Sequence, residues 1–291
     1  MKVKDIIFKG CGTAICSPFK NGKIDIQEFR KLIRFQMENK ADSIIVCGTT
    51  GESPTLSFDE KVELIQCAVA TSNGKIPIIA GTGSNNTKHA IELSQKAEEL
   101  GVDGLLVVTP YYNKCTQNGL IEYYSSIAQN VHLPIIMYNV PSRTGVNIEP
   151  QTCFELSKTP NIVAIKEASG NISQVAKIAN LCKGNLNIYS GNDDQILPIL
   201  SLGGIGVISV LGNVEPELVH NICSDFWNGN FEKAKSLQLD NLPLINALFE
   251  EVNPIPIKYL LSKYGFEFGS PRSPLTNISQ KLADKIDLLK S

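Results

Sequence analysis

Eight short apolar segments recur along the first 210 residues of the chain, and their regular spacing constrains the fold more than any other feature. They begin at residues 11, 43, 76, 104, 133, 161, 186 and 206. The steps between these starts are 32, 33, 28, 29, 28, 25 and 20 residues. Each step is long enough for a strand, a helix and two loops. Strands this apolar cannot leave one face in water, so they predict a parallel sheet covered by helices.

Two architectures satisfy this pattern, an open doubly wound sheet and a closed barrel. Eight regular units within about 220 residues favour the barrel. The glycine fingerprint GxGxxG of dinucleotide-binding sheets is missing after the first segment, where SPFKNGK follows. Beyond residue 228 the helical segments have no strand partners. We therefore predict an α/β fold, with a (β/α)8 TIM barrel over residues 1–228 and a small C-terminal helical region over residues 229–291.

Composition excludes several classes of protein. The 27 basic residues nearly balance the 29 acidic ones, which gives no electrostatic case for binding nucleic acid or a membrane surface. No apolar run approaches the ~20 residues of a membrane span, and the N-terminus lacks an apolar leader, so we expect a cytoplasmic protein. The eight cysteines form no CxxC pattern and the three histidines are isolated, which predicts reduced core thiols and no metal site.

Polar motifs follow six of the apolar segments. They are rich in Gly, Thr, Tyr and Asn, and they read GTTGES (48–53), GTGSNN (81–86), TPYYNK (109–114), YNVPSRTG (138–145), KEASGN (166–171) and SGNDD (190–194). In a parallel barrel the carboxyl ends of all strands meet at one face, where active sites form. The six motifs therefore predict one shared active-site mouth.

Lys166 is the residue in these motifs that points most specifically to one kind of chemistry. It ends the segment NIVAIK, where strand alternation predicts that Ile162, Ala164 and Lys166 share one side. If that side faces the barrel interior, burial disfavours the ammonium and yields a neutral amine able to form a Schiff base with a carbonyl substrate. The alternative is a buried lysine paired with a carboxylate, either Glu167 or Asp193.

Other polar residues near the strand ends have similar double interpretations. Tyr138 could carry protons beside the lysine or could be a core tyrosine. Arg143 offers a fork suited to a carboxylate or is an exposed loop arginine. Thr49 and Thr50, flanked by glycines, present hydroxyls and amides that suit a small carboxylate. The acidic sequence GNDDQ after the seventh segment disfavours a phosphate site and hence phosphosugar aldolase chemistry.

In this order and spacing, the motifs resemble those of the dihydrodipicolinate synthase family, within the pyruvate-dependent Schiff-base lyases. The resemblance covers essentially the whole chain, including NPIPIK in the C-terminal region. It implies a lyase that condenses pyruvate with L-aspartate 4-semialdehyde, in the diaminopimelate route to lysine. It implies no metal and no organic cofactor, because the imine itself acts as the electron sink.

The resemblance also implies roles for the reacting residues. Lys166 matches the lysine that forms the imine with pyruvate, and Tyr138 matches the central proton carrier. Thr49 and Tyr112 complete a hydroxyl relay to solvent. In the family this second tyrosine comes from a neighbouring subunit, so a dimer is the smallest complete unit, and homotetramers built as dimers of dimers are common.

Substrate-binding roles follow from the same resemblance. Thr50 matches a contact to the pyruvate carboxylate, Arg143 matches the residue that receives the semialdehyde carboxylate, and Gly191 and Ile208 match backbone positions that line the lysine's pocket. Two alternatives remain. One is another lyase of the superfamily, such as N-acetylneuraminate lyase or a 2-keto-3-deoxy-sugar-acid aldolase. The other is a non-catalytic barrel that senses a small molecule.

Regulation is where the sequence departs from part of the family. Lysine-inhibited members bind lysine at a dimer interface whose matching positions here are Ser53, Phe58, Lys61, Asn85, His89 and Tyr111. Inhibited members typically carry histidine at position 61 and glutamate at position 89. Lys61 and His89 instead place potential positive charge there, which predicts weak or absent inhibition by lysine.

Overall fold

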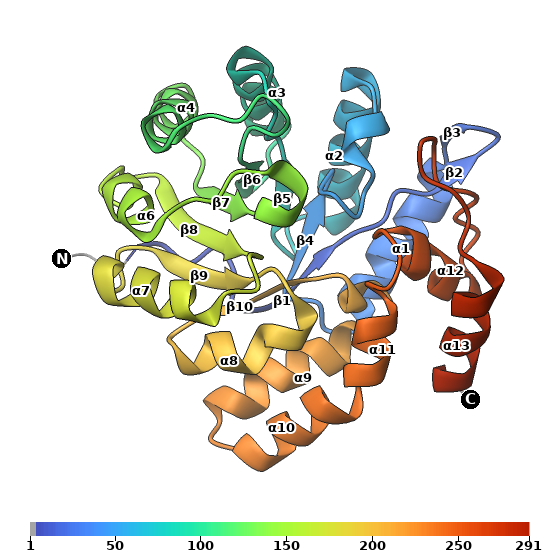
Figure 1. Cartoon of the computed structure of the whole chain (residues 1–291). Coiled ribbons are helices and arrows are strands. Elements are labelled where there is room, and N and C mark those ends of the chain that lie inside the picture. Colours follow the sequence, from blue (N-terminus) through green and yellow to red (C-terminus); the bar gives the residue numbers. More distant parts are fainter. Residues whose placement is uncertain (1–3, 291) are drawn as a thin grey trace.

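Eight parallel strands form a closed barrel in the computed structural model, which describes residues 4–290 (Figure 1). The order around the barrel is β1-β10-β9-β8-β7-β6-β5-β4, so each strand pairs with its neighbours in sequence and the last pairs with the first. This confirms the (β/α)8 barrel and excludes the open sheet. The strands are β1 (Gly10–Ala14), β4 (Ser43–Val46), β5 (Ile78–Gly81), β6 (Gly104–Val108), β7 (Ile135–Asn139), β8 (Ile162–Glu167), β9 (Asn187–Ser190) and β10 (Gly206–Ser209).

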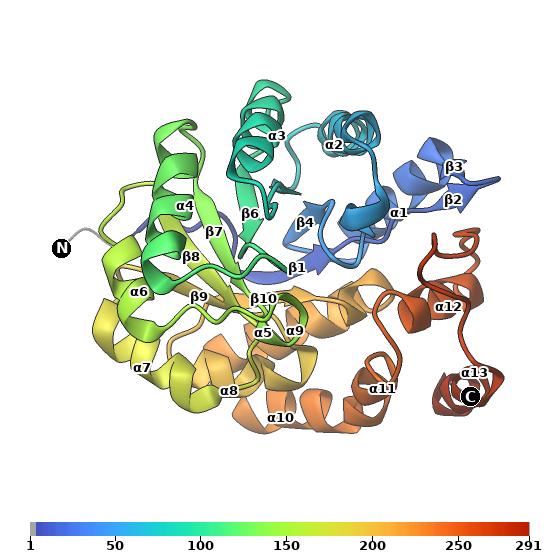
Figure 2. The ribbon, with the colours of Figure 1, turned by 45° about the horizontal axis from the view of Figure 1, so that its top comes forward.

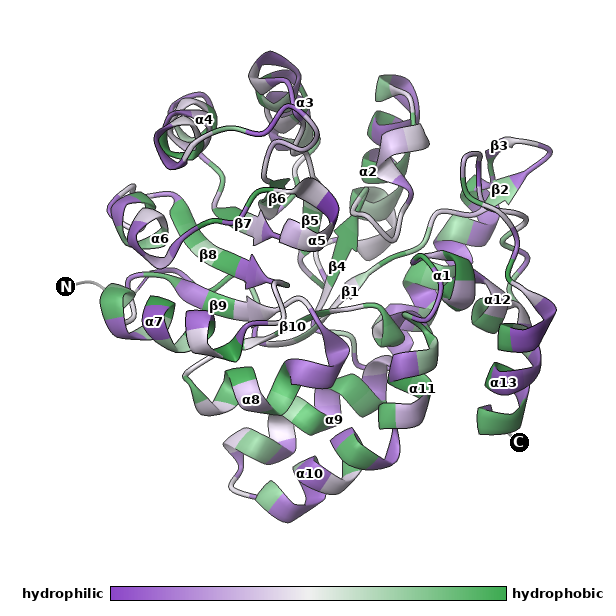
Figure 3. Ribbon diagram, in the orientation of Figure 1, coloured by the Kyte–Doolittle hydropathy of each residue, from purple (hydrophilic) through white to green (hydrophobic). Residues whose placement is uncertain are grey.

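Helices cover the outside of the barrel because each has one apolar side. Figure 3 shows hydrophobic and hydrophilic residues alternating along these helices, as expected for elements that are half buried. Ser57 and Glu60 form a capping box at the start of α2 (Phe58–Ser72), which satisfies backbone N–H groups of its first turn. The covering helices are α1 (Ile26–Glu38), α2 (Phe58–Ser72), α3 (Thr87–Glu99), α4 (Gln117–Gln129), α6 (Pro150–Leu156), α7 (Ile172–Cys182), α8 (Ile196–Ser201) and α9 (Pro216–Trp227).

A separate apolar cluster fills the barrel interior. It joins inward side chains from several strands, among them Ile45, Ile79 and Ile208. Phe8, just before β1, stacks on Tyr189 with ring centroids 4.4 Å apart and closes the amino-terminal end of the barrel. The opposite end, where the polar motifs lie, is therefore the open one.

One expectation about β8 is wrong. Ala164 belongs to the interior cluster, but Ile162 packs in the outer layer between strands and helices. The reason is a bulge. Ile135 and Ile136 on β7 pair with Ile162 and Ala164, so Val163 is an extra residue that breaks the alternation. Beyond the bulge the alternation resumes.

Of the C-terminal helices, α12 (Ile255–Lys263) lies beside α1 and a small hairpin formed by β2 (Phe19–Lys20) and β3 (Lys23–Ile24) (Figure 2). The helical segment over residues 231–249 is divided at Asn241 and Pro243 into two helices. The helices of this region are α10 (Phe231–Asp240), α11 (Leu242–Ala247), α12 (Ile255–Lys263) and α13 (Gln280–Lys290). The division of the chain at residue 228 stays a prediction, since α10 packs directly on α9.

Short helical turns follow several strands within residues 4–290. The turns are η1 (Ser53–Thr55), α5 (Pro141–Thr144), η2 (Asp193–Gln195) and η3 (Leu211–Asn213). Within those residues no helix has the length and apolar character needed to cross a membrane. No group of three metal-binding side chains occurs there either. All eight cysteines are free, and seven of them are buried.

Candidate active site

Lys166 lies near the carboxyl end of β8, buried, on the interior side of the barrel. Its Nζ is 4.3 Å from the centroid of the Tyr138 ring. Among the described residues, no carboxylate lies within ion-pair distance of this amine. Burial lowers the pKa of Lys166 below its usual value, although the nearby Tyr138 and Asp193 oppose that shift. A lowered pKa makes the neutral amine more accessible, as a nucleophilic lysine requires.

Strand pairing brings Tyr138 to the lysine. Tyr138 on β7 and Lys166 on β8 are direct partners in the sheet register, and both side chains point inward. Asn139 and Glu167, the next residues on each strand, are also partners and point outward. Each strand end therefore carries one inward side chain that could react and one outward side chain that anchors it.

The carboxylate of Glu167, on the outside of the barrel, accepts hydrogen bonds from buried amide groups. Its Oε2 accepts hydrogen bonds from Asn139 Nδ2 and Gln174 Nε2, both at 3.0 Å, and its Oε1 accepts from the backbone N–H of Ser169 at 2.7 Å. Asn147 links the same two amides through further hydrogen bonds. Glu167 thus holds β7, β8 and α7 together and forms no ion pair with the lysine.

Asp193 is the other acid that the sequence offers as a lysine partner. It is buried in η2, and its Oδ2 accepts from the backbone N–H groups of Val210 at 3.0 Å and Leu211 at 2.9 Å. Burial raises the pKa of Asp193, although hydrogen bonds from Ser209 and these amides, and the charge of Lys166, oppose the shift. Asp193 influences the lysine through the electric field and does not pair with it.

Of the two predicted backbone positions, Gly191 lies against the stem of Lys166 and Ile208 lies in the barrel interior. A Cβ on Gly191 would lie 2.5 Å from Ala168 Cβ and 3.1 Å from Lys166 Cε, so only glycine fits beside the lysine stem. Ile208 is fully buried in the same interior cluster as Tyr138. The contact at Gly191 therefore confines the stem of Lys166 on one side.

The loop between β4 and α2 supplies the two threonines. Thr49 lines a cavity of about 610 Å³ at the open end of the barrel. Thr50 is buried, and its Oγ1 accepts a hydrogen bond from Asn253 Nδ2 at 3.0 Å. Sequence reasoning missed Asn253, because the only local signal was an Asn-Pro turn 203 residues away from the threonine.

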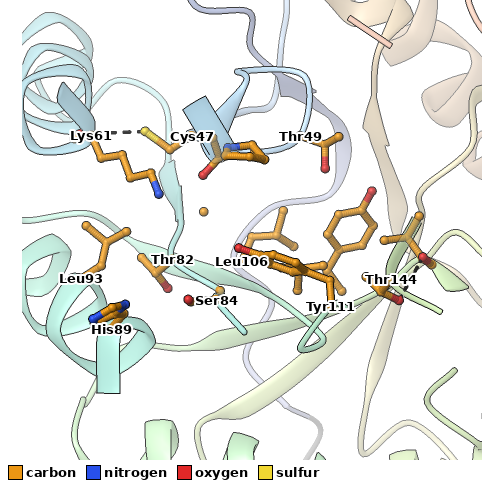
Figure 4. A pocket seen from close by; sticks show the side chains of 18 of the residues that line it. Cys47, Thr49, Lys61, Thr82, Ser84, His89, Leu93, Leu106, Tyr111 and Thr144 are labelled. Carbon is orange, nitrogen blue, oxygen red and sulfur yellow. Dashed lines mark hydrogen bonds between the residues drawn. The ribbon is translucent and has the colours of Figure 1, made fainter. Parts of the chain in front are cut away.

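The cavity is lined by three of the eight predicted site residues and does not include Lys166, Thr50, Gly191, Ile208 or Tyr112. Its wall includes Thr49, Tyr138 and the exposed Arg143, whose guanidinium donates to the backbone oxygen of Asn253 at 3.5 Å. Figure 4 shows the side opposite the threonine, where Lys61 extends from α2 toward Thr82 and His89. The cavity wall is completed by residues that include Ser53, Phe58, Gly81, Ser84, Glu92, Leu93, Leu106, Val108, Tyr111, Val140 and Thr144.

Tyr112 does not join the others. Its side chain is 94% exposed and the residue does not line the cavity, whereas Tyr111 does. The backbone of Tyr112 has φ +70°, a left-handed conformation that is uncommon for a bulky residue. A large aromatic held out in water in such a conformation is typical of a contact surface.

Comparison with known proteins shows similarity over nearly the whole chain. The model of the dihydrodipicolinate synthetase family matches residues 7–290. The 4-hydroxy-tetrahydrodipicolinate synthase of Caldicellulosiruptor saccharolyticus is 59% identical over 276 residues, which cover 94% of this chain and 93% of that protein.

Solved structures show the same similarity in three dimensions. The dihydrodipicolinate synthase of Thermotoga maritima superposes with a TM-score of 0.96 at 42% identity, and the match covers 98% of each chain. The enzyme of Cyanidioschyzon merolae, solved with lysine bound, gives a TM-score of 0.95 at 40% identity, again over 98% of each chain.

Proposed function

Because the chain belongs to the dihydrodipicolinate synthetase family, we propose that it condenses pyruvate with L-aspartate 4-semialdehyde through an imine on Lys166. Its activity is that of a 4-hydroxy-tetrahydrodipicolinate synthase, a Schiff-base-forming lyase of lysine biosynthesis. The observation that carries the mechanism is the buried amine of Lys166, which has a lowered pKa and lies 4.3 Å from the ring of Tyr138.

The chemistry begins when the neutral Lys166 amine attacks the ketone carbon of pyruvate. The resulting carbinolamine loses water to give the imine, and loss of a methyl proton then gives the enamine. The enamine carbon attacks the aldehyde carbon of the semialdehyde. Tyr138 is placed to carry protons in each step, since its strand register holds it beside the amine. The imine serves as the electron sink, so these steps require no metal or organic cofactor.

Two carboxylates must be held during this reaction. We assign the pyruvate carboxylate to Thr50 and the adjoining backbone of the β4–α2 loop, with Gly191 and Ile208 confining the carbon skeleton near the amine. We assign the semialdehyde carboxylate to Arg143, which lines the cavity and is exposed to incoming substrate. An arginine fork matches a carboxylate in two parallel hydrogen bonds.

Tyr112 enters the proposal through self-association. We propose that Thr49, Tyr138 and the partner subunit's Tyr112 form a hydroxyl relay, within a homotetramer built as a dimer of dimers. The support is the exposure of Tyr112 away from the cavity of its own chain. Sedimentation of the wild-type protein, together with activity of Tyr112→Phe, tests it. A fully active monomer would contradict this role.

Weak inhibition by lysine is a separate proposal. Lys61 and His89 face each other across one side of the cavity (Figure 4), where a lysine effector would bring its own ammonium. Like charges in a partly enclosed site repel, so we expect little response to lysine. Half-inhibition at sub-millimolar lysine in a steady-state assay would contradict this.

We also propose that the enzyme works in the cytoplasm, a reducing compartment that suits eight free cysteines.

Trapping of the imine is the decisive experiment. The protein is incubated with pyruvate, reduced with borohydride, digested and analysed by mass spectrometry. We expect the reduced adduct on Lys166 and none in Lys166→Ala. Lys61 lines the cavity and serves as the internal control, so a label there in place of Lys166 would refute the mechanism. A coupled assay with the semialdehyde, compared with N-acetylmannosamine and sugar aldehydes, then identifies the second substrate.

A further inference from the structure

Asn253 contacts both groups that we assign to substrate carboxylates. Its Nδ2 donates to Thr50 Oγ1 at 3.0 Å, and its backbone oxygen accepts from the guanidinium of Arg143 at 3.5 Å. Asn253 and Thr50 are both buried, so water does not compete for their hydrogen bond. One residue from the C-terminal region therefore joins two parts of the site that come from different loops of the barrel.

The surrounding contacts fix the geometry of this junction. Helix α12 begins two residues after Asn253 and carries Lys258, whose Nζ lies 2.5 Å from Glu52 Oε1 in a fully buried ion pair. The backbone N–H of Arg272 donates to the other oxygen of Glu52 at 2.8 Å. The ion pair thus joins the two segments again, two residues beyond Thr50 and five residues beyond Asn253, which leaves the Asn253–Thr50 hydrogen bond little freedom to change.

The direction of the hydrogen bond has a chemical consequence. The amide nitrogen of Asn253 can only donate, so Thr50 Oγ1 must accept, and the hydroxyl hydrogen of Thr50 stays free. A free hydroxyl hydrogen is what a carboxylate needs from a threonine. The other amide atom, Asn253 Oδ1, is buried and has no hydrogen-bond partner within residues 4–290, so the contact to Thr50 is made by the amide nitrogen alone.

We propose that Asn253 is a positioning residue that keeps the Thr50 hydroxyl oriented as a donor to the pyruvate carboxylate. This rests on the proposed function, because it assumes that pyruvate binds at Thr50. The Arg143 contact uses the backbone of Asn253, so a side-chain substitution should disturb pyruvate binding and leave semialdehyde binding nearly unchanged.

Substitution by aspartate tests the direction of the bond. A carboxylate can only accept, so in Asn253→Asp the Thr50 hydroxyl must turn and donate to it. We expect the KM for pyruvate to rise about 10- to 100-fold, because a hydrogen bond to a charged group is lost. In Asn253→Leu the hydroxyl loses a partner but keeps its hydrogen, and we expect a rise of about three- to tenfold. The KM for the semialdehyde should stay within about twofold in both variants.

Two controls separate this effect from added charge and from loss of structure. Asn277→Asp makes the same charge change at an exposed position of the C-terminal region and should leave both KM values unchanged. Thr50→Val removes the hydroxyl, and in that background Asn253→Asp should raise the KM for pyruvate less than about threefold further.

The proposal is overturned if Asn253→Asp is no worse than Asn253→Leu, or if it costs as much in the Thr50→Val background as in the wild type. If Asn253→Asp does not fold, the cycle of Asn253→Leu with Thr50→Val replaces it, and additive losses overturn the proposal. Failure of the wild-type protein to trap pyruvate on Lys166 would refute the proposed function instead, which keeps the two failures apart.

Discussion

The buried ion pair between Lys258 and Glu52 leads to a specific prediction about stability, which Lys258→Met tests. The two side chains are 2% and 1% exposed, and their charged atoms are 2.5 Å apart. Methionine is one atom shorter than lysine and keeps an unbranched apolar stem, but it leaves the Glu52 carboxylate buried beside the backbone N–H of Arg272. Removing one partner of a buried ion pair lowers the free energy of unfolding by about 3–5 kcal/mol.

The double variant E52Q/K258M should behave differently, because it removes both charges together. Burial lowers the pKa of Lys258 even though Glu52 opposes that shift, so lost hydration outweighs the attraction between the charges. We therefore expect the double variant to lie within about 1 kcal/mol of the wild type or above it. The contrast between single and double variants isolates the charge that is left unpaired.

Thermal unfolding measures the effect. At about 2–4 °C per kcal/mol for a domain of this size, Lys258→Met should lower Tm by about 6–20 °C. The double variant should recover most of that loss. A single variant that melts within about 3 °C of the wild type, or a double variant as unstable as the single one, would refute the reasoning.

Three further substitutions test other parts of the molecule. Gly191→Ala places a methyl group 3.1 Å from Lys166 Cε, and we expect imine formation with pyruvate to slow on the order of 100-fold as the lysine is displaced. Glu167→Gln keeps the side-chain shape but presents an N–H to donors, so kcat should fall with little change in the KM for pyruvate. His220→Gln should change how stability depends on pH. The hydrogen bond with Asp42 raises the pKa of His220, so its stabilisation is complete below the unfolded value of about 6.5 and is lost as the pH rises through the higher folded value.

Each of these has a control and a contrary result. Gly203→Ala changes a glycine with open space around it, so its imine formation should match the wild type and any loss should appear in stability alone. For Glu167→Gln, adding Gln174→Glu returns a carboxylate to the amide cluster and should recover part of kcat; no recovery would argue against the cluster. For His220→Gln, a Tm difference from the wild type that is constant between pH 5 and about pH 9 would contradict the assignment.

Strand patterning made the barrel and the lysine predictable. Apolar segments buried on both faces, repeated eight times, leave few alternatives to a closed parallel sheet. Alternation placed Ala164 and Lys166 correctly, because both lie beyond the bulge. It misplaced Ile162, since an extra residue in a strand leaves no mark in a hydrophobic pattern.

Long-range contacts were not predictable from local patterns. Nothing near Asn253 in the sequence indicates that its side chain reaches Thr50. Likewise, nothing near Arg272 indicates that its guanidinium binds the carboxylate of Glu60 in α2. Such contacts depend on how the C-terminal helices fold back over α1 and the β4–α2 loop. The sequence motif also joined Tyr111 and Tyr112, which the left-handed backbone at Tyr112 sends in different directions.

The hydrogen bond between Asn253 and Thr50 has a consequence for the order of synthesis. A ribosome releases the chain from its N-terminus, so Thr50 emerges 203 residues before its partner. A nascent chain that ends before Asn253 already holds all eight strands and the reactive amine of Lys166. It does not yet hold the group that orients Thr50. The amine is thus built first, and the last segment to be made completes the part of the site that captures its substrate.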